Sequence, residues 1–413
     1  MRRLLPLNNR SRNIFFIIFS VVIIAIFGYV MFHQLKYGDF PIHIAWAKEY
    51  AADGYLYKIP HTLFSKFVVI IRALLPANIL VRVSVFAKQI YDLKSYEISA
   101  WILMVLSYLA TAFILFIKIS KDWYELKVKN LRYLTGITVI VIMLVGPIYL
   151  FTMPNRMYSG YIVPNPYHNP TYVLLRPFAL IIFFGIIKNF FVKWDWYQSL
   201  IMILMIVCAS LAKPSFNITI LPSLGLFILV FYLKNIKNVN WFYILGPIGI
   251  TSVVVLFSQF IINYSGDRGE KILFAPFKSM LNWVPDIPSI LLSLFLSLLF
   301  PLLLSIFYWN ELKTRPSFRL VWLNLIISIV IGYVFVEEIN WQTNNFWWGT
   351  MIGLFLVFVE ATTFFGKRLI EKGVRYSFRS WKTITLGTIL SIHLVCGIIY
   401  YIYSILSLTG LVL

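Results

Sequence analysis

Charged residues are scarce in this chain, and their scarcity excludes a soluble globular protein. Only 13% of the 413 residues are Asp, Glu, Lys or Arg, whereas 60% are hydrophobic and the mean hydropathy is +0.82. Apolar runs of about 17 or more residues recur along the chain, and runs of this length are typical of membrane-crossing helices. The sequence therefore predicts an all-α fold, a polytopic bundle of transmembrane helices.

Several chemical motifs are missing. The two cysteines, Cys208 and Cys396, both lie inside apolar runs, which excludes a disulfide framework and a thiolate metal site. There is no glycine loop that would cradle a phosphate, no zinc-binding HExxH and no nucleophile elbow. We therefore predict no cofactor and no metal ligands, although a divalent metal remains compatible with the composition. No basic stripe with interleaved aromatic residues stands apart from the apolar runs, so nucleic acid is not a predicted partner.

The apolar runs predict about eleven spans when they are set against the charge and turn signals. The basic N-terminal residues are followed by a run that lacks a small-residue cleavage site, so this run should remain as a signal anchor. The predicted spans cover residues 14–32, 97–117, 134–152, 171–187, 197–212, 217–233, 241–262, 289–308, 320–336, 350–365 and 384–408.

The distribution of charge orients these spans. With the N-terminus inside, most of the 36 Lys and Arg residues fall in inner segments, and most of the 16 Asp and Glu residues fall in outer ones. This bias satisfies the positive-inside rule and places the C-terminus outside. The net charge of +20 then reflects orientation and attraction to an anionic lipid bilayer. Richness in Ile, Phe, Lys and Asn favours a bacterial plasma membrane, with the chain as a multi-pass protein.

The outer connections are longer than the inner ones and carry the candidate chemistry. We treat residues 1–413 as a single integral membrane domain. The first outer loop, residues 33–96, is longer than a connection requires, and long loops are usually functional. It predicts two or three membrane-surface helices, over residues 40–53, 61–75 and 77–93, the second lying in the interface. The further outer loops are residues 153–170, 263–288 and 337–349.

Asp39 and His43 stand directly after the first span. If a helix begins near Phe40, the two side chains are four residues apart and share one face, where both can reach one ligand. Asp39 would then be a general base at the outer membrane surface, and His43 would orient it or bind the acceptor. Alternatively, Asp39 caps a helix that has Pro41 in its first turn.

Basic residues near the outer membrane surface are candidate phosphate ligands. Lys213 joins two apolar runs with almost no loop between them, and Arg176 lies one turn into a span. Charge near membrane depth costs on the order of 2–3 kcal/mol and tends to be functional or paired. The alternative for both residues is a side chain that snorkels to the interface.

The later outer loops add further candidates for substrate binding. The loop at 153–170 holds Arg156 and His168, and the loop at 263–288 holds Arg268. In the last outer loop, Glu337, Glu338 and Asn340 are followed by three tryptophans. Carboxylates and amides beside indole rings suit a sugar, which offers hydroxyl groups and an apolar face. The alternative is an aromatic belt at the interface.

The layout resembles the GT-C superfamily of integral membrane glycosyltransferases. The resemblance rests on Gly38-Asp39-Phe40-Pro41, Lys213-Pro214-Ser215-Phe216 and Asn345-Phe346-Trp347-Trp348-Gly349, within a bundle of more than ten spans. It implies a polyprenyl-phosphate-linked sugar donor and a catalytic acidic residue just after the first span, the position of Asp39. Many relatives carry two neighbouring acidic residues in this loop, whereas here Glu49 and Asp53 follow at a distance, so we predict no bound cation.

These observations predict a transferase that moves a sugar from a polyprenyl-phosphate donor to a glycan or glycolipid acceptor on the outer face. Two other hypotheses stay open. A polysaccharide polymerase or ligase would rely on arginine and histidine in later loops, and a transporter or flippase should show repeated halves with interrupted spans. Neither the sugar nor a protein partner follows from the sequence. The predicted phosphate ligands are Lys213, Arg156, Arg176 and Arg268.

Overall fold

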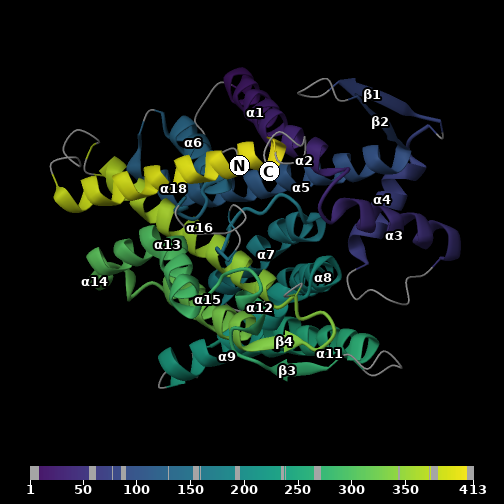
Figure 1. The fold of residues 1–413 in the computed structure, drawn as a ribbon. Coiled ribbons are helices and arrows are strands. Elements are labelled where there is room, and N and C mark those ends of the chain that lie inside the picture. The colour runs from purple at the N-terminus through teal and green to yellow at the C-terminus, as the bar shows by residue number, and fades with distance from the viewer. Residues whose placement is uncertain are drawn as a thin grey trace.

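The protein is a mostly helical bundle that carries two small hairpins of strand (Figure 1). The computed structural model describes residues 9–54, 62–76, 78–84, 90–128, 130–151, 158, 160–190, 196–233, 237, 239–264, 271–342, 345–371, 373 and 380–406.

The first half of the chain builds the first span, the outer loop and four further helices. The first span is continuous through α1 (Asn9–Ile23), η1 (Ile24–Gly28) and α2 (Tyr29–Gln34). It is followed by α3 (Phe40–Asp53), α4 (Leu63–Ala73), β1 (Leu80–Ser84), β2 (Ile90–Lys94), α5 (Ser95–Trp123), η3 (Tyr124–Leu126), α6 (Leu131–Leu144), α7 (Pro170–Asn189) and α8 (Trp196–Ala212).

The second half begins with α9 (Ser215–Phe231), which follows α8 after a two-residue turn. The remaining elements are α10 (Trp241–Tyr243), η5 (Ile244–Ile250), α11 (Thr251–Tyr264), β3 (Ile272–Phe274), α12 (Lys278–Leu281), α13 (Ile287–Phe307), α14 (Trp309–Leu312), α15 (Pro316–Val334), β4 (Phe335–Glu337), α16 (Trp347–Glu371) and α18 (Trp381–Leu406).

Helix length and composition mark this as a membrane protein. Within the described ranges, eight helical segments are long and apolar enough to cross a bilayer, and three shorter apolar helices accompany them. The shorter three are α6, α8 and α9. A helix appears in each of the eleven apolar runs of the sequence, so an all-α polytopic bundle is confirmed, while the number of spans stays a prediction.

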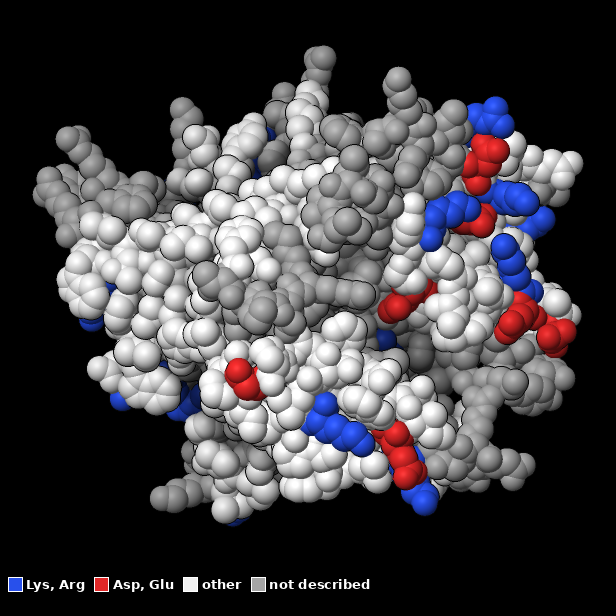
Figure 2. Space-filling view, viewed as in Figure 1, with Lys and Arg blue, Asp and Glu red and all other residues white. Residues whose placement is uncertain are grey.

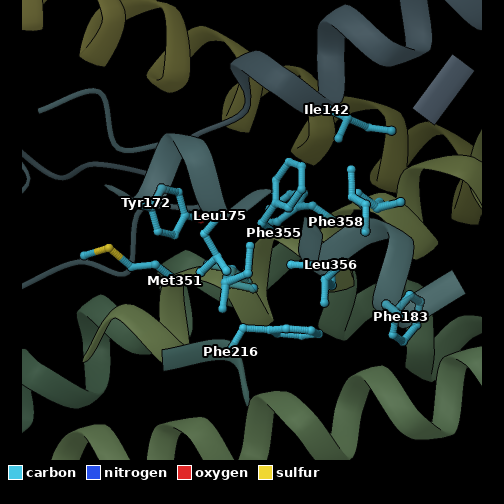
Figure 3. Packing of buried hydrophobic residues seen from close by; sticks show 14 of the residues in the cluster. Ile142, Tyr172, Leu175, Phe183, Phe216, Met351, Phe355, Leu356 and Phe358 are labelled. Atoms are coloured by element: carbon cyan, nitrogen blue, oxygen red, sulfur yellow. The ribbon is translucent and has the colours of Figure 1, made fainter. Parts of the chain in front are cut away.

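The core is centred on α16, the most buried of the long helices. Figure 3 shows its residues Met351, Phe355 and Phe358 facing side chains from α6, α7 and α9. Tyr172 and Phe216, which face it from α7 and α9, are fully buried. Inside a bilayer, helix association depends on close packing more than on the hydrophobic effect, so this interdigitation holds the bundle together.

The expected span at 134–152 is only partly helical, because α6 ends at Leu144. Gly146 and Pro147 follow, and Pro147 lacks the N–H that would continue the helix. The extended backbone is satisfied by neighbouring helices: the Gly146 N–H donates to the His393 carbonyl (3.1 Å) and the Ile148 N–H to the Leu296 carbonyl (3.3 Å). Irregular backbone at membrane depth persists only where protein groups pair with it in this way.

The side chain of His393 in α18 also forms hydrogen bonds at the break after α6. Its Nδ1 lies 2.6 Å from the Gly146 carbonyl oxygen, and the Phe300 N–H donates to its Nε2 at 3.3 Å. The imidazole is therefore assigned as the tautomer with the proton on Nδ1. One buried ring thus joins α18, α13 and the end of α6.

In the first outer loop, the predicted helices at 40–53 and 61–75 correspond to α3 and α4. The third, expected over 77–93, is wrong: its described residues form the antiparallel hairpin β1–β2. Valines alternate with polar residues in Val81-Arg82-Val83, the period of a strand, and Arg82 pairs across to Asp92 at 2.9 Å. At 11 residues, α4 is about 16 Å long and too short to cross a bilayer.

Charged side chains are concentrated at one end of the bundle. In Figure 1, α3, α4 and β1–β2 lie at one end and α14 at the opposite end. Figure 2 shows Lys, Arg, Asp and Glu gathered over the first of these ends, while most of the visible flank carries none. At this end Glu97 forms two ion pairs: its carboxylate lies 3.7 Å from the Lys36 ammonium and 4.0 Å from the Lys48 ammonium.

Gly397 provides a test of the packing around the α6 break. A Cβ at Gly397 would overlap the Leu144 carbonyl oxygen and lie 2.6 Å from the Gly146 nitrogen, whereas a Cβ at Gly225 in α9 would meet nothing within 4 Å. Gly397→Ala should lower the free energy of unfolding by roughly 1–3 kcal/mol through overpacking. Gly225→Ala should be neutral or stabilising. Thermal unfolding in detergent measures both, and equal midpoints for the two variants would contradict the packing described here.

Candidate functional site

Asp39 is positioned by a close approach between the start of α3 and the segment before α7. Gly38 has a φ of +59°, and a Cβ there would lie 3.0 Å from the His168 Cβ and 3.1 Å from the His168 carbonyl oxygen. Glycine is therefore required both by the left-handed backbone and by the contact. The contact is secured by the Asp39 N–H, which donates to the His168 carbonyl at 3.2 Å.

The Asp39 side chain does not cap its helix. Asp39 occupies the N-cap position of α3, but its carboxylate accepts no hydrogen bond from the first turn. Instead the Asn169 Nδ2 donates to Asp39 Oδ2 at 2.5 Å. Helix capping therefore does not account for an aspartate here, and the partly exposed carboxylate keeps acceptor capacity for a ligand.

Asn169 connects this carboxylate to an ammonium group. Its Oδ1 accepts from the Thr171 hydroxyl (2.7 Å) and from the Tyr172 N–H (2.8 Å), so Asn169 is also the N-cap of α7. The Lys213 ammonium donates to Thr171 Oγ1 at 3.3 Å. Every donor in the chain Lys213–Thr171–Asn169–Asp39 points toward the aspartate. We call this the polar chain.

Lys213 is almost enclosed, with 6% of its surface exposed. It lies in the turn between α8 and α9, and its ammonium sits 4.5 Å from the centre of the Trp348 ring, a cation–π contact. Burial lowers the pKa of Lys213 to about 8, although the charges of Asp39 and Glu337 act in the opposite direction. The site therefore holds a cation whose protonation changes near neutral pH.

Two histidines flank the polar chain. His43 is buried on α3, edge-on to Trp46 and Phe64, and burial together with the nearby Lys213 charge lowers its pKa, opposed by Asp39. The His168 ring lies 5.6 Å from the Trp348 ring, centre to centre, at a tilt of 51°, and burial lowers its pKa too. Both imidazoles are therefore neutral at pH 7, which suits them to hydrogen bonding rather than charge pairing.

An apolar groove begins at Lys213 and runs between α9 and α11, with a volume of about 460 Å³. At its polar end it is lined by Lys213, Ser215 and Glu337. Farther along it is lined by Ile218, Leu221, Val253, Leu256, Phe257 and Phe260. Val253, Phe257 and Phe260 are largely exposed, so the groove opens on the flank of the bundle. We call it the outer groove, after the orientation proposed below. Its shape suits a ligand with an apolar tail and an anionic head.

Glu337 closes the polar end of the outer groove. It is fixed by two hydrogen bonds, from the Tyr264 hydroxyl (2.9 Å) and from the Asn345 Nδ2 (2.6 Å). Its charge favours the protonated form of Lys213. A second carboxylate thus lines the groove together with the ammonium.

The structure gathers only part of the residue set expected from the sequence. Asp39, His43, His168, Lys213 and Glu337 come together. Glu338 and Asn340 are exposed and do not line the groove. Arg156 and Arg268 lie outside the described residues.

Arg176 is placed deeper than its sequence position indicated. It is fully buried in α7, its guanidinium 4.4 Å from the centre of the Tyr108 ring, with Nη1 donating to Asn165 Oδ1 at 3.0 Å. The Asn165 amide in turn donates to the carbonyls of Ile142 and Val145 at the end of α6. Arg176 therefore braces the helix break and does not line the outer groove.

Two residues of the site, Asn169 and Thr171, were not identified from the sequence, and the role of a third, Trp348, differs from the one expected. For Asn169 a signal was available, since Asn followed by Pro170 is typical of a helix start. Nothing local indicated that its amide would reach Asp39, 130 positions earlier. Trp348 had been counted as a possible stacking surface for a sugar, but it is buried and faces Lys213.

Comparison with known proteins gives no independent identification. No family model, no curated protein and no solved structure is detectably similar to this chain. Among the residues that the structure describes, no three His, Cys, Asp or Glu side chains form a cluster that could bind a metal ion. Function is therefore inferred from the geometry of the polar chain and the outer groove.

Proposed function

We propose that the protein is a membrane glycosyltransferase, which moves a sugar from a polyprenyl-phosphate donor to a hydroxyl of a glycan or glycolipid acceptor. One observation carries the proposal. A carboxylate with free acceptor capacity and a buried ammonium are linked by the polar chain, and that ammonium stands at the head of a lipid-facing apolar groove. A lipid-linked phosphosugar matches this arrangement: apolar tail, anionic phosphate and a sugar beyond it.

The donor would enter sideways from the bilayer. Its polyprenyl tail would lie along Leu221, Val253 and Phe257, and its phosphate would meet Lys213 at the polar end. The phosphate then supplies the counter-charge that the buried ammonium otherwise obtains only at a distance, from Asp39 and Glu337. Charge-assisted hydrogen bonds of this kind are roughly twice as strong as neutral ones.

In the transfer step, Asp39 acts as the general base. An acceptor oxygen attacks the anomeric carbon of the sugar, the bond from that carbon to the phosphate oxygen breaks, and the phosphate leaves with the bonding electrons. The acceptor proton passes to the Asp39 carboxylate, which Asn169 holds in place. Lys213 offsets the charge that develops on the departing phosphate. His43, neutral and buried beside Asp39, orients the acceptor.

The proposal includes an orientation, with the N-terminus inside and the Asp39 end of the bundle outside. The positive-inside distribution of Lys and Arg supports it. In a chain whose two native cysteines are replaced by alanine, Asn340→Cys should react with a membrane-impermeant maleimide on intact cells. Glu125→Cys, exposed in η3, should react only after lysis. Labelling of Glu125→Cys on intact cells, with Asn340→Cys protected, would reverse the orientation.

Asp39→Asn tests the base directly. The amide can occupy the same space but cannot accept the acceptor proton, so transfer should fall by about 10²- to 10⁴-fold. Asp53→Asn, at the exposed far end of the same helix, is the matched control and should keep wild-type activity. Transfer would be measured with purified protein and a radiolabelled lipid-linked donor. Retained transfer in Asp39→Asn would remove the base role of Asp39. The absence of transfer by the wild-type protein, as expected of a flippase, would remove the transferase proposal.

Lys213→Met separates the role in binding from any role in stability. Because burial lowers the pKa of Lys213 from 10.5 to about 8, its charge destabilises the folded state fully below about pH 8 and not at all above about pH 10.5. At pH 7 the methionine variant should therefore unfold at the same temperature or higher. Transfer at subsaturating donor should nevertheless fall roughly tenfold to a hundredfold through loss of a charged hydrogen bond.

The pH dependence of donor use gives the matched control for this variant. In the wild type, kcat/KM for the donor should decline as pH rises through about 8, because the ammonium loses its proton. Lys213→Arg stays charged and should lack that decline, even if its absolute rate is lower. The same decline in Lys213→Arg would assign the titration to another group.

A further inference from the structure

A second apolar groove lies at the other end of α9, away from the polar chain. Ser215 at the start of α9 lines the outer groove, whereas Phe231 at its end lines this one. The second groove has a volume of about 810 Å³ and is formed by α13, α14 and α15 with the end of α9. We call it the inner groove, because the orientation proposed above puts it in the inner leaflet.

Two kinds of side chain line the inner groove. Leu302, Ile306, Leu323 and Ile326 provide an apolar channel, and the large exposed fractions of Ile306 (60%) and Ile326 (52%) show that it opens on the flank of the bundle. The channel ends at two basic residues, Lys313 and Arg319, beside Trp309 and Trp322. Tryptophans at such a level are typical of the boundary between acyl chains and headgroups.

The charge of the inner groove is one-sided. Among the described residues, its lining includes two cations and no carboxylate. Arg319 is held in place, with its guanidinium 4.6 Å from the centre of the Phe231 ring and its Nε donating to the Lys313 carbonyl. The nearby Glu311 is engaged by Arg368. The groove therefore presents fixed positive charge at the end of an apolar channel.

From this combination we infer that the inner groove binds an anionic phospholipid of the inner leaflet. One acyl chain lies along Ile306 and Ile326, and the phosphate contacts Arg319 and Lys313. Basic pockets between transmembrane helices on the cytoplasmic side are suited to anionic headgroups, and arginine binds phosphate oxygens with a paired donor geometry. The inference uses the proposed orientation but not the transferase chemistry, so either can fail without the other.

The test compares phosphatidylglycerol with phosphatidylcholine on the full-length protein in detergent, by native mass spectrometry. Wild-type protein should retain one phosphatidylglycerol preferentially. Lys313→Gln/Arg319→Gln should weaken its binding by about tenfold or more, as expected for loss of charged hydrogen bonds, with little effect on phosphatidylcholine. The matched control is Lys121→Gln/Lys188→Gln, which removes the same charge from exposed inner positions outside the groove.

Other results would overturn the inference. An equal loss in the control variant would indicate general attraction to the basic inner surface, and equal retention of both lipids would indicate an apolar groove without headgroup recognition. A dimer lost on Ile326→Glu would assign the groove to a second copy of the chain. If the double variant does not fold, the exposed Lys313→Gln change alone and Leu323→Trp, which fills the channel and keeps both charges, provide the same comparison.

Discussion

The constraint on which the candidate site depends is the cost of keeping the Lys213 ammonium away from water. A buried charge is tolerated only with partners, and here the partners come from distant parts of the chain: Thr171 at the start of α7, Trp348 at the start of α16, and the charges of Asp39 and Glu337. Four segments must converge for the ammonium to be tolerable. The same four segments that supply partners to the ammonium therefore form the candidate site. A bound phosphate would be a further partner for the ammonium.

The second constraint is that backbone N–H and C=O groups at membrane depth must be hydrogen-bonded. This constraint explains which groups surround the break after α6. Proline removes a donor there, and the freed groups pair with α13 and α18 through main-chain contacts and the His393 ring. The Asn165 side-chain N–H groups donate to two carbonyls at the end of α6, and its Oδ1 accepts a hydrogen bond from Arg176. Polar residues buried in the bundle thus pair with an irregular backbone, whereas Thr171 and Asn169 beside Lys213 link the ammonium to the Asp39 carboxylate.

Local signals in the sequence were sufficient where structure is local. The helix expected over residues 40–53, with Pro41 in its first turn, agrees with α3, and the apolar runs located the helices of the bundle. The β1–β2 hairpin was missed because a short apolar stretch with basic residues fits an interfacial helix as well as a strand. Asp39 and Lys213 stood out because charge near an apolar span is rare. Their connection through Asn169 and Thr171 is a long-range contact that no window of sequence contains.

The amide in the middle of the polar chain has a consequence of its own. Hydroxyl and ammonium groups exchange protons readily, but a carboxamide N–H does not. Asn169 therefore blocks proton transfer along the polar chain: the Asp39 charge favours the protonated form of Lys213, but the carboxylate cannot take a proton from it through the amide. Its orientation is locked, because its oxygen is occupied by Thr171 and by the first turn of α7. The Lys213 ammonium can thus lose its proton to water without a proton passing along the polar chain to or from Asp39.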